Sequence, residues 1–222
     1  MSHPAEMSDP TARVFFERLH ASEDPWNFGS DAYELGRYES ILRFVPPGRF
    51  GHVLEPGCSV GVLTDRLADR CGRITAVDIS ANALVSARRR CARHSNVRFV
   101  RSSITDARLD FADHGRSFDL IVLSEVGYYF AETELTSLVR RLIGLADTAC
   151  SINGTRLIAG HWLGHSVDHV LHGSQVHRVL EGILGPPTHS ETKGAESNGF
   201  VLDVWDMLPA EASAAHAQES TP

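Results

Sequence analysis

The sequence has little of what membrane, metal-binding and disulfide-stabilised proteins need. No apolar run reaches the length of a membrane span, and no signal-peptide core is found. The four cysteines contain no C-x-x-C pair and match no common zinc spacing; they are Cys58, Cys71, Cys91 and Cys150. We therefore expect a reduced, cytoplasmic protein that has no membrane partner.

Positive charge is also scarce, with 21 Lys and Arg against 28 Asp and Glu and a net charge of −7. Domains that bind nucleic-acid backbones are usually basic, so we expect no nucleic-acid partner. The one basic run, residues 86–93, is interleaved with apolar residues at helical spacing. This pattern favours the solvated face of a crossover helix.

The dinucleotide fingerprint G-x-G-x-x-G is missing as well. Residues 52–61 read H-V-L-E-P-G-C-S-V-G, so an apolar run ends at Glu55 and is followed by Gly57 and Gly61. Dinucleotide folds bring a helix N-terminus onto a pyrophosphate. Glu55 would repel a pyrophosphate but suits a ligand with a cationic amino-acid end, which argues against an NAD-linked oxidoreductase.

A second acid, Asp78, ends another apolar run 21 residues after Gly57. The two runs form a βαβ unit in which Asp78 stands where a ribose would be held. The E-x-G-x-x-x-G turn with a later Asp resembles motif I and its acidic partner in class I S-adenosylmethionine methyltransferases. Ser59 replaces the third glycine of their usual form. The alternative is an ordinary strand-to-helix turn whose glycines allow tight packing.

Strand-like and helix-like segments alternate over residues 11–208, which we expect to form a single α/β domain. The chain's 222 residues and 42% hydrophobic content are enough for one such core. The continuous apolar run 118–123 predicts a parallel sheet covered on both faces. The predicted strands are 52–56, 73–78, 97–101, 118–124, 155–161 and 199–205, and the predicted helices are 11–20, 31–45, 60–70, 80–94, 132–147 and 173–184. We expect residues 1–10 to be flexible and 209–222 to be disordered.

Ligands of open α/β sheets bind beyond the carboxyl ends of the strands, so residues just past each strand are the site candidates. The first two strands supply an acid for a cationic amino group, a glycine turn, an acid for the ribose and an apolar cover for adenine. These cofactor candidates are Glu55, Gly57, Cys58, Gly61, Asp78 and Ile79.

The third strand is followed by Ser103 and Ile104. Many relatives of the methyltransferase superfamily have an acid at the position of Ser103, where it binds the adenine amino group. A hydroxyl is a weaker acceptor than a carboxylate, and Asp106 is a possible substitute. Capping of the loop is the alternative role for both residues.

The fourth strand leads into Ser124 and Glu125, which are also cofactor-binding candidates, and then into Tyr128 and Tyr129. In the superfamily this segment forms the floor of the methyl-transfer site. Glu125 is interpreted as a general base or as an anchor for a cationic nitrogen, with holding of the loop as the alternative. One of the two tyrosines is expected to line the pocket while the other packs in the core.

The fifth strand ends at His161 and Trp162, and a histidine at this position suits acid–base chemistry near neutral pH. The segment 161–177 holds five histidines, and an H-x3-H-x3-H spacing would align three imidazoles if it were helical. Its glycines and valines argue against a helix. We predict a polar loop over the pocket and no metal.

An aromatic segment precedes the glycine turn and contains Trp26, Phe28, Tyr33 and Tyr38. These side chains either attach a helix to the sheet or form a lid that keeps water off the cofactor. Trp26 and Tyr38 are the cofactor-binding candidates among them.

Several motifs together are similar to the nodulation protein S group of small S-adenosylmethionine-dependent N-methyltransferases, over residues 14–206. They are Asp24-Pro25-Trp26, L-E-P-G-C-S-V-G, Asp78, F-D-L-I-V-L-S-E-V-x-Y-Y, the H-W pair at 161–162 and V-H at 176–177. The resemblance implies a Rossmann-like class I fold with a mostly parallel seven-stranded sheet and a late antiparallel strand. It also implies S-adenosyl-L-methionine as cofactor, S-adenosyl-L-homocysteine as product, and the amine of an amino sugar or deacetylated oligosaccharide as acceptor.

The acceptor-binding candidates are Tyr128, Tyr129, Trp162, His165 and His177. Relatives read H-W-R-H-P where this chain reads H-W-L-G-H-S, which leaves the role of His165 open. A protonated amine has no lone pair and must lose its proton before or during attack on the sulfonium carbon. The candidates to take this proton are Glu125 and His161. The alternatives are an O-methyltransferase of a small metabolite and an S-adenosylmethionine-binding accessory protein without turnover. We expect the protein to be a monomer or a homodimer.

Overall fold

A seven-stranded sheet forms the centre of the computed structural model, which describes residues 9–106, 118–145, 154–195 and 198–207. Its strand order is β3-β2-β1-β4-β5-β7-β6. The first five strands pair in parallel, whereas β7 pairs antiparallel with both β5 and β6. The strands are β1 (His52–Pro56), β2 (Arg73–Asp78), β3 (Val97–Arg101), β4 (Leu120–Ser124), β5 (Thr155–Trp162), β6 (His189–Lys193) and β7 (Phe200–Met207).

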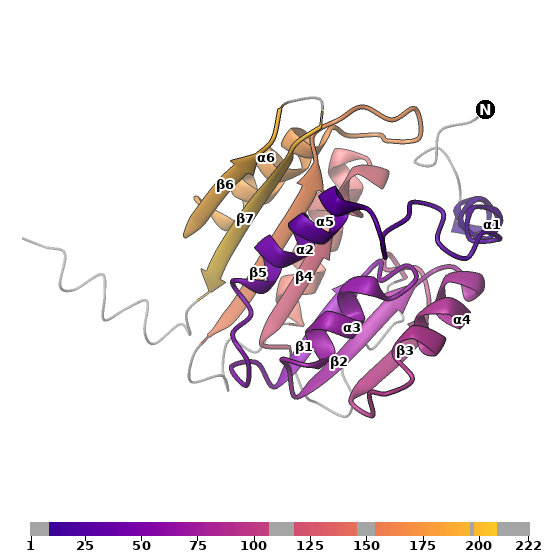
Figure 1. Ribbon diagram of the computed structural model, residues 1–222. Coiled ribbons are helices and arrows are strands. Elements are labelled where there is room, and N and C mark those ends of the chain that lie inside the picture. The colour runs from indigo at the N-terminus through magenta and orange to yellow at the C-terminus, as the bar shows by residue number, and fades with distance from the viewer. Residues whose placement is uncertain (1–8, 107–117, 146–153, 196–197, 208–222) are drawn as a thin grey trace, which may run out of the picture.

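Helices cover both faces of the sheet (Figure 1). One face carries α2 (Ala32–Leu42), α3 (Val62–Ala68) and α4 (Ala81–Arg90), and the other carries α5 (Glu132–Gly144) and α6 (Gly173–Leu184). Each face encloses its own apolar cluster. The helix α1 (Asp9–Leu19) lies beside α4, and a short 3-10 helix, η2 (Gly127–Tyr129), follows β4.

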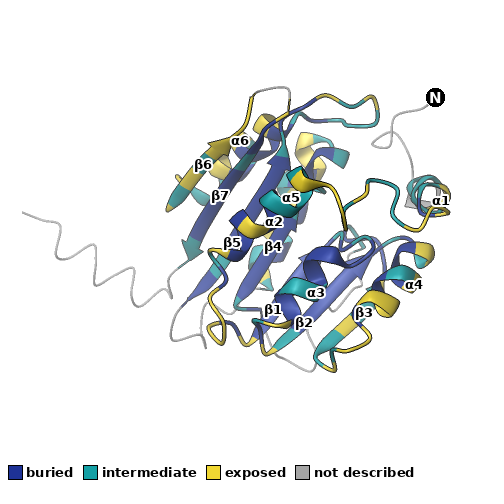
Figure 2. Cartoon of the chain, in the orientation of Figure 1, coloured by how far each residue is buried: buried dark blue, intermediate teal, exposed yellow. Residues whose placement is uncertain are grey.

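The strand β4 has the burial expected of a central strand in a parallel sheet. Its residues Leu120, Ile121, Val122 and Leu123 are fully buried, and the strand pairs with β1 on one side and β5 on the other (Figure 2). Such apolar runs suit a strand that helices cover on both faces. Because the chain order reverses between β1 and β4, a crevice is expected at their carboxyl ends.

Local signals set the ends of the helices. Asp31 caps α2 by accepting hydrogen bonds from the backbone N–H groups of Tyr33 and Glu34, and Ser80 caps α4 in the same way through Ala83. Pro46-Pro47-Gly48 follows the end of α2. None of the helices in the described part of the chain is long and apolar enough to cross a membrane.

The structure confirms the predicted class I fold and differs from the sequence prediction in detail. Strand β6, with the sequence H-S-E-T-K, is absent from the predicted strands because it is a polar, partly exposed edge strand without an apolar run. The predicted helix 31–45 ends earlier, at Leu42, and the predicted strand 118–124 begins at Leu120. Helix α1 begins at Asp9, while residues 1–8 and 208–222 lie outside the described residues.

Candidate functional site

A cavity of about 760 Å³ opens beyond the carboxyl ends of β1, β2 and β4. Helices α1 and α2, the segment that follows β3 and the loop 163–172 contribute to its other walls. Most of the predicted site residues line it, namely Trp26, Tyr38, Glu55, Gly57, Cys58, Asp78, Ile79, Ser103, Ile104, Ser124, Glu125, Tyr128, Tyr129 and Trp162. Four predicted site residues lie outside the lining: Gly61, His161, His165 and His177.

The glycines of the β1 turn have different roles. Gly57 lines the cavity with φ of 73°, and a Cβ there would lie 2.9 Å from Val126 Cγ2, so only glycine fits. Gly61 also has a positive φ, 78°, and a Cβ there would lie 2.9 Å from Ala87 Cβ of α4, which is too close. Gly61 therefore lets α3 approach α4 and has a packing role.

Ser59, which stands in place of a third glycine, adopts the left-handed region with φ of 48°. This conformation explains why glycine suits the position. The side chain forms a contact that glycine would lack, because Ser59 Oγ lies 2.9 Å from His20 Nε2. Ser59 thus connects the turn to the segment that follows α1.

Glu55 is a buried carboxyl group at the end of β1, with 3% of the residue exposed. Thr64 Oγ1 donates a hydrogen bond of 2.6 Å to Glu55 Oε2. Burial raises the pKa of Glu55 to about 8, and nearby Asp78 acts in the same direction, while the Thr64 hydrogen bond opposes them. A cation in the cavity would favour the charged form of this group.

Asp78 ends β2, and each of its carboxylate oxygens already accepts one backbone hydrogen bond. Ser59 N–H donates to Oδ2 at 2.8 Å, and Ser80 N–H donates to Oδ1 at 2.9 Å. Burial raises the pKa of Asp78, although these two backbone donors lower it. Since a carboxylate oxygen has two lone pairs, one on each oxygen remains for a diol. Ile79 lies in the lining beside it.

Ser103 and Ile104 line the cavity after β3, as predicted. The Ser103 hydroxyl lies 2.6 Å from Thr105 Oγ1, so its partner is a neighbouring hydroxyl. Asp106, the possible substitute for an adenine-binding acid, is not among the described lining residues. Ser103 is therefore the better placed of the two.

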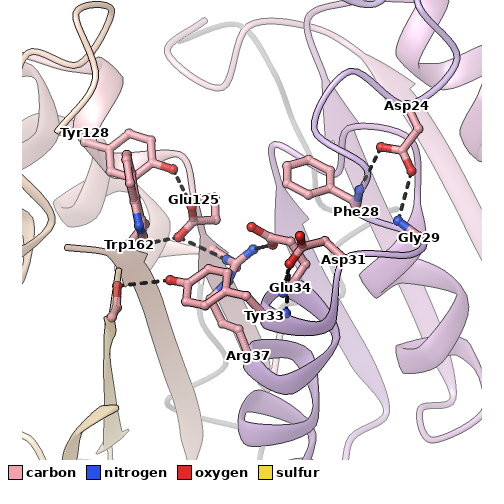
Figure 3. Close-up of polar contacts among 12 residues, drawn as sticks. Asp24, Phe28, Gly29, Asp31, Tyr33, Glu34, Arg37, Glu125, Tyr128 and Trp162 are labelled. Carbon is pink, nitrogen blue, oxygen red and sulfur yellow. Dashed lines mark hydrogen bonds and ion pairs between the residues drawn. The ribbon is translucent and has the colours of Figure 1, made fainter. Parts of the chain in front are cut away.

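A buried arginine and two acids form the other half of the cavity (Figure 3). Arg37, on α2, has no exposed surface and lies with Nη1 3.0 Å from Glu125 Oε1. It donates a 2.8 Å hydrogen bond to Ser124 Oγ, and its Nη2 is paired with Glu34. A buried cation requires such partners, so the two acids and the arginine form one ion-paired unit.

Glu125 is fixed by backbone and side chain together. Its φ of 56° is rare for a residue with a Cβ. Trp162 N–H donates to Oε1 at 2.7 Å, and the Tyr128 hydroxyl donates to Oε2 at 2.6 Å (Figure 3). The carboxylate is thereby held at the cavity wall by groups from α2, η2 and β5.

Two tyrosines that follow Glu125 in the chain pack against other aromatic rings. Tyr128 stacks on His169 with ring centroids 3.7 Å apart, and Tyr129 meets Phe16 of α1 edge to face. Burial, followed by Glu125, raises the pKa of Tyr128 well above its ordinary value, so the phenol is a hydrogen-bond donor to Glu125. Both tyrosines line the cavity, and Tyr128 also packs in the apolar core, as the sequence had predicted for one of the two.

The histidines of the predicted loop separate into distinct environments. His161 has no exposed surface and His177 is 5% exposed, and neither reaches the cavity lining. His165 is exposed on the loop 163–172, which is not helical, so the H-x3-H-x3-H face does not form. The histidine of the segment 161–177 that lines the cavity is His169.

The sequence interpretation missed the cavity residues Glu34 and Arg37, as well as the docking of α1. Glu17 of α1 accepts hydrogen bonds from Ala81 N–H and Asn82 N–H at the start of α4, at 2.9 and 3.0 Å. This contact brings His20 over the Ser59 turn. The i, i+3 spacing of Glu34 and Arg37 was visible, but it is equally typical of a solvent-exposed helix pair.

Comparisons with known proteins point to one family. The family model of Nodulation protein S (NodS) matches residues 8–165. Nodulation protein S of Bradyrhizobium diazoefficiens is 34% identical over 141 residues, covering 63% of this chain and 65% of that protein. The Sinorhizobium fredii protein of the same name is 32% identical over 127 residues, 56% of each chain. The chain thus matches between about half and two thirds of the length of these curated relatives.

Among solved structures, the fold is similar to that of the N-methyltransferase NodS from Bradyrhizobium japonicum WM9 in complex with S-adenosyl-L-homocysteine. The TM-score is 0.73 with 24% identity, and the match covers 88% of this chain and 97% of that one. The similarity confirms the predicted class I methyltransferase fold. Since the family model covers more than half of the sequence, the chain belongs to the nodulation protein S family.

Proposed function

We propose that this protein transfers a methyl group from S-adenosyl-L-methionine to the amine of a small molecule. The observation that carries the proposal is a single cavity with two acidic halves. Glu55 and Asp78 form one half, and Glu34 and Glu125, bridged by Arg37, form the other. One half suits a nucleoside with a cationic amino-acid end, and the other suits a cationic acceptor.

The charge of the lining supports cationic ligands. Arg37 is the sole Lys or Arg side chain among the described lining residues. Seven carboxylate side chains accompany it: Asp31, Glu34, Glu55, Asp78, Glu125, Glu134 and Asp168. A cleft lined by one sign of charge attracts ligands of the opposite sign. Both a sulfonium and a protonated amine fulfil this condition.

The chain's own residues fit S-adenosylmethionine. Asp78 retains lone pairs for two ribose hydroxyls, Glu55 is a buried acid that a cationic amino group would satisfy, and Gly57 leaves room for close approach. When bound, the cofactor supplies a methyl group already activated by its sulfonium. The protein's task is then to orient the donor and acceptor and to exclude water.

We assign the acceptor side to Glu125. A protonated amine beside this carboxylate would transfer its proton to it, directly or through a water molecule, and its nitrogen would then have a lone pair for attack. Arg37, Trp162 N–H and Tyr128 hold the carboxylate in place. His161 was the other candidate for this step, but its position behind the cavity wall disfavours it.

Family membership suggests the class of amine. The solved relative from Bradyrhizobium japonicum is an N-methyltransferase, and an amino sugar or deacetylated oligosaccharide is the acceptor we propose for this chain. We also propose that the protein works in the cytoplasm as a monomer or homodimer. Its cysteines Cys58, Cys71 and Cys91 are free thiols, as suits a reducing compartment.

The decisive experiment incubates the purified protein with S-adenosylmethionine and amino sugars, deacetylated chito-oligosaccharides or their N-acetylated forms. Mass spectrometry would detect the added methyl group, and S-adenosylhomocysteine would report turnover. Methylation of the free amines, with no reaction of the acetylated controls, would support the proposal. Methylation on oxygen would identify an O-methyltransferase, and cofactor binding without any turnover would identify an accessory protein.

The raised pKa of Glu55 predicts how affinity for the cofactor depends on pH. The free carboxyl group is mostly protonated below pH 8, since its pKa is about 8. A cationic ligand would lower this pKa, so binding should release a proton and tighten as pH rises towards 8. Below the free pKa, affinity changes by at most about tenfold per pH unit for one proton released.

Calorimetry in buffers of different ionisation enthalpy would measure the proton release, with Glu55→Gln as the matched variant. The ligand's own amino group titrates identically with both proteins, so the difference between the two affinity curves isolates Glu55. Identical curves for the parent and the variant would show that Glu55 does not bind the cationic end.

A further inference from the structure

The function proposed above does not use a buried chain of polar groups behind the acceptor half of the cavity. His161 Nδ1 lies 3.0 Å from His177 Nε2, and His177 Nδ1 lies 2.6 Å from Asp203 Oδ2. At the other end of the chain, Gly127 N–H donates to His161 Nε2 at 3.1 Å. The four groups come from β7, α6, β5 and η2, and all four residues are buried.

The donors and acceptors in this chain can be arranged in one direction. The Asp203 carboxylate accepts from His177 Nδ1–H, which leaves His177 Nε2 as an acceptor. His177 Nε2 then accepts from His161 Nδ1–H, so His161 Nε2 is left with the lone pair that receives Gly127 N–H. Every one of these contacts is satisfied when both imidazoles are neutral. Burial, followed by His177, lowers the pKa of His161 well below its ordinary value, in agreement with a neutral ring.

The chain ends on the loop that carries Glu125. Gly127 is two residues further on and begins η2, and Tyr128 of η2 donates directly to the Glu125 carboxylate. A Cβ on Gly127 would lie 2.6 Å from Val176 Cγ1 and 2.9 Å from His161 Nε2. Helix α6 and strand β5 therefore pack directly against Gly127. Any larger residue at this position would have to displace the turn from them.

The conformation of the loop needs such support. Glu125 has φ of 56°, which is unfavourable for a residue with a side chain. Its N–H is bonded to Gly160 O of β5 at 3.0 Å, and the Gly127–His161 hydrogen bond is the next attachment of the loop to the same strand. Together these two bonds hold both sides of Glu125 against β5.

We propose that His177 and Asp203 are positioning residues for methyl transfer, acting through His161 to hold the Gly127 turn and hence the Glu125 carboxylate at the acceptor. This inference rests on the proposed function. By fixing the tautomer of His161, the Asp203–His177 pair ensures that a lone pair faces Gly127 N–H. A ring with a proton on Nε2 would instead present a donor to a donor.

A polar network that only fills the core would behave differently. Its loss would lower the stability of the whole domain and would affect both halves of the cavity alike. A positioning role affects the acceptor half first, because the carboxyl groups of the other half are held by Thr64, Ser59 and Ser80, which are not members of this chain. Turnover and cofactor affinity therefore distinguish the two possibilities.

The test uses His177→Leu, which removes the acceptor for His161, and His177→Gln, whose side-chain oxygen can replace it. We expect His177→Leu to lower kcat about 100-fold, as a displacement of roughly 1 Å does in other sites, with little change in cofactor affinity. We expect His177→Gln to recover most of kcat. The matched control is His52→Leu, since His52 is buried to a similar degree but lies at the opposite end of β1, bonded to Thr75.

Amide hydrogen exchange at Gly127 provides a readout that needs no acceptor. Exchange should be slow in the parent and in His177→Gln, and faster in His177→Leu. Asp203→Ala, which removes the acceptor of His177 Nδ1–H, replaces the leucine variant if that protein does not fold. The proposal is overturned if Gly127 stays equally protected in all variants, or if His177→Gln loses as much turnover as His177→Leu. Absence of methyl transfer by the parent would instead reject the proposed function, while the exchange data would still test the hydrogen-bond chain.

Discussion

Replacement of Glu125 by glutamine is expected to lower kcat/KM for an amine acceptor by about 100- to 10,000-fold, the range typical of a positioned acid–base group. The substitution keeps the shape of the side chain and removes its charge and its basicity. The amide oxygen can still accept from Trp162 N–H and Arg37. The Tyr128 hydroxyl, which donates to Oε2, can rotate to accept from the new NH2 group.

Cofactor affinity should change little in Glu125→Gln, because Glu55 and Asp78 lie in the other half of the cavity. Glu134→Gln is the matched control. Glu134 also lines the cavity, but its carboxylate caps α5 by accepting from Ala131 N–H at 3.0 Å. Steady-state kinetics with a methyl acceptor would measure both variants. Equal losses in the two variants would show that the general negative charge matters and that Glu125 has no particular role.

The sequence was most informative where function depends on contacts within one strand–turn–strand unit. The residues from Glu55 to Asp78 are close in the chain, and the parallel pairing of β1 and β2 brings their ends together. The glycine spacing and the two acids therefore sufficed to predict where Glu55, Gly57 and Asp78 would lie. The apolar runs likewise predicted the strands β1, β2 and β3 with their observed bounds.

The acceptor half was harder to predict because its contacts join distant segments. Arg37 and Glu125 are 88 positions apart in the sequence, and their pairing depends on how α2 packs on β5 and β7. A charged residue in an amphipathic helix is normally interpreted as exposed, and nothing local marks Arg37 as buried. Three-dimensional packing decides this question.

For His161, the sequence predicted the position in the strand but not the surroundings of the side chain. Its position at the end of β5 was predicted, but strand position does not determine whether a side chain faces the cavity or the layer beneath it. The structure places His161 against α6, with His177 as its partner. Ser59 was predicted as a departure from the family pattern, but its contact with His20 depends on the docking of α1 through Glu17.

Replacement of Asp78 by alanine is expected to weaken cofactor binding by about 100-fold or more. Two hydrogen bonds from ribose hydroxyls to a charged acceptor contribute about 1.5 kcal/mol or more each, and about 1.4 kcal/mol corresponds to tenfold in affinity. The variant also loses the acceptors of Ser59 N–H and Ser80 N–H, so part of the effect could arise from a disturbed turn.

Asp119→Ala separates the two causes. Asp119 also accepts two backbone hydrogen bonds, from Gly51 N–H at 2.6 Å and His52 N–H at 2.9 Å, but it lies at the amino end of β1, outside the cavity lining. Thermal unfolding should show destabilisation of both variants, whereas calorimetric titration with S-adenosylmethionine should show weakened binding for Asp78→Ala alone. Parental affinity in Asp78→Ala would mean that the carboxylate at the end of β2 only shapes the turn, and the ribose would then have to bind elsewhere in the cavity.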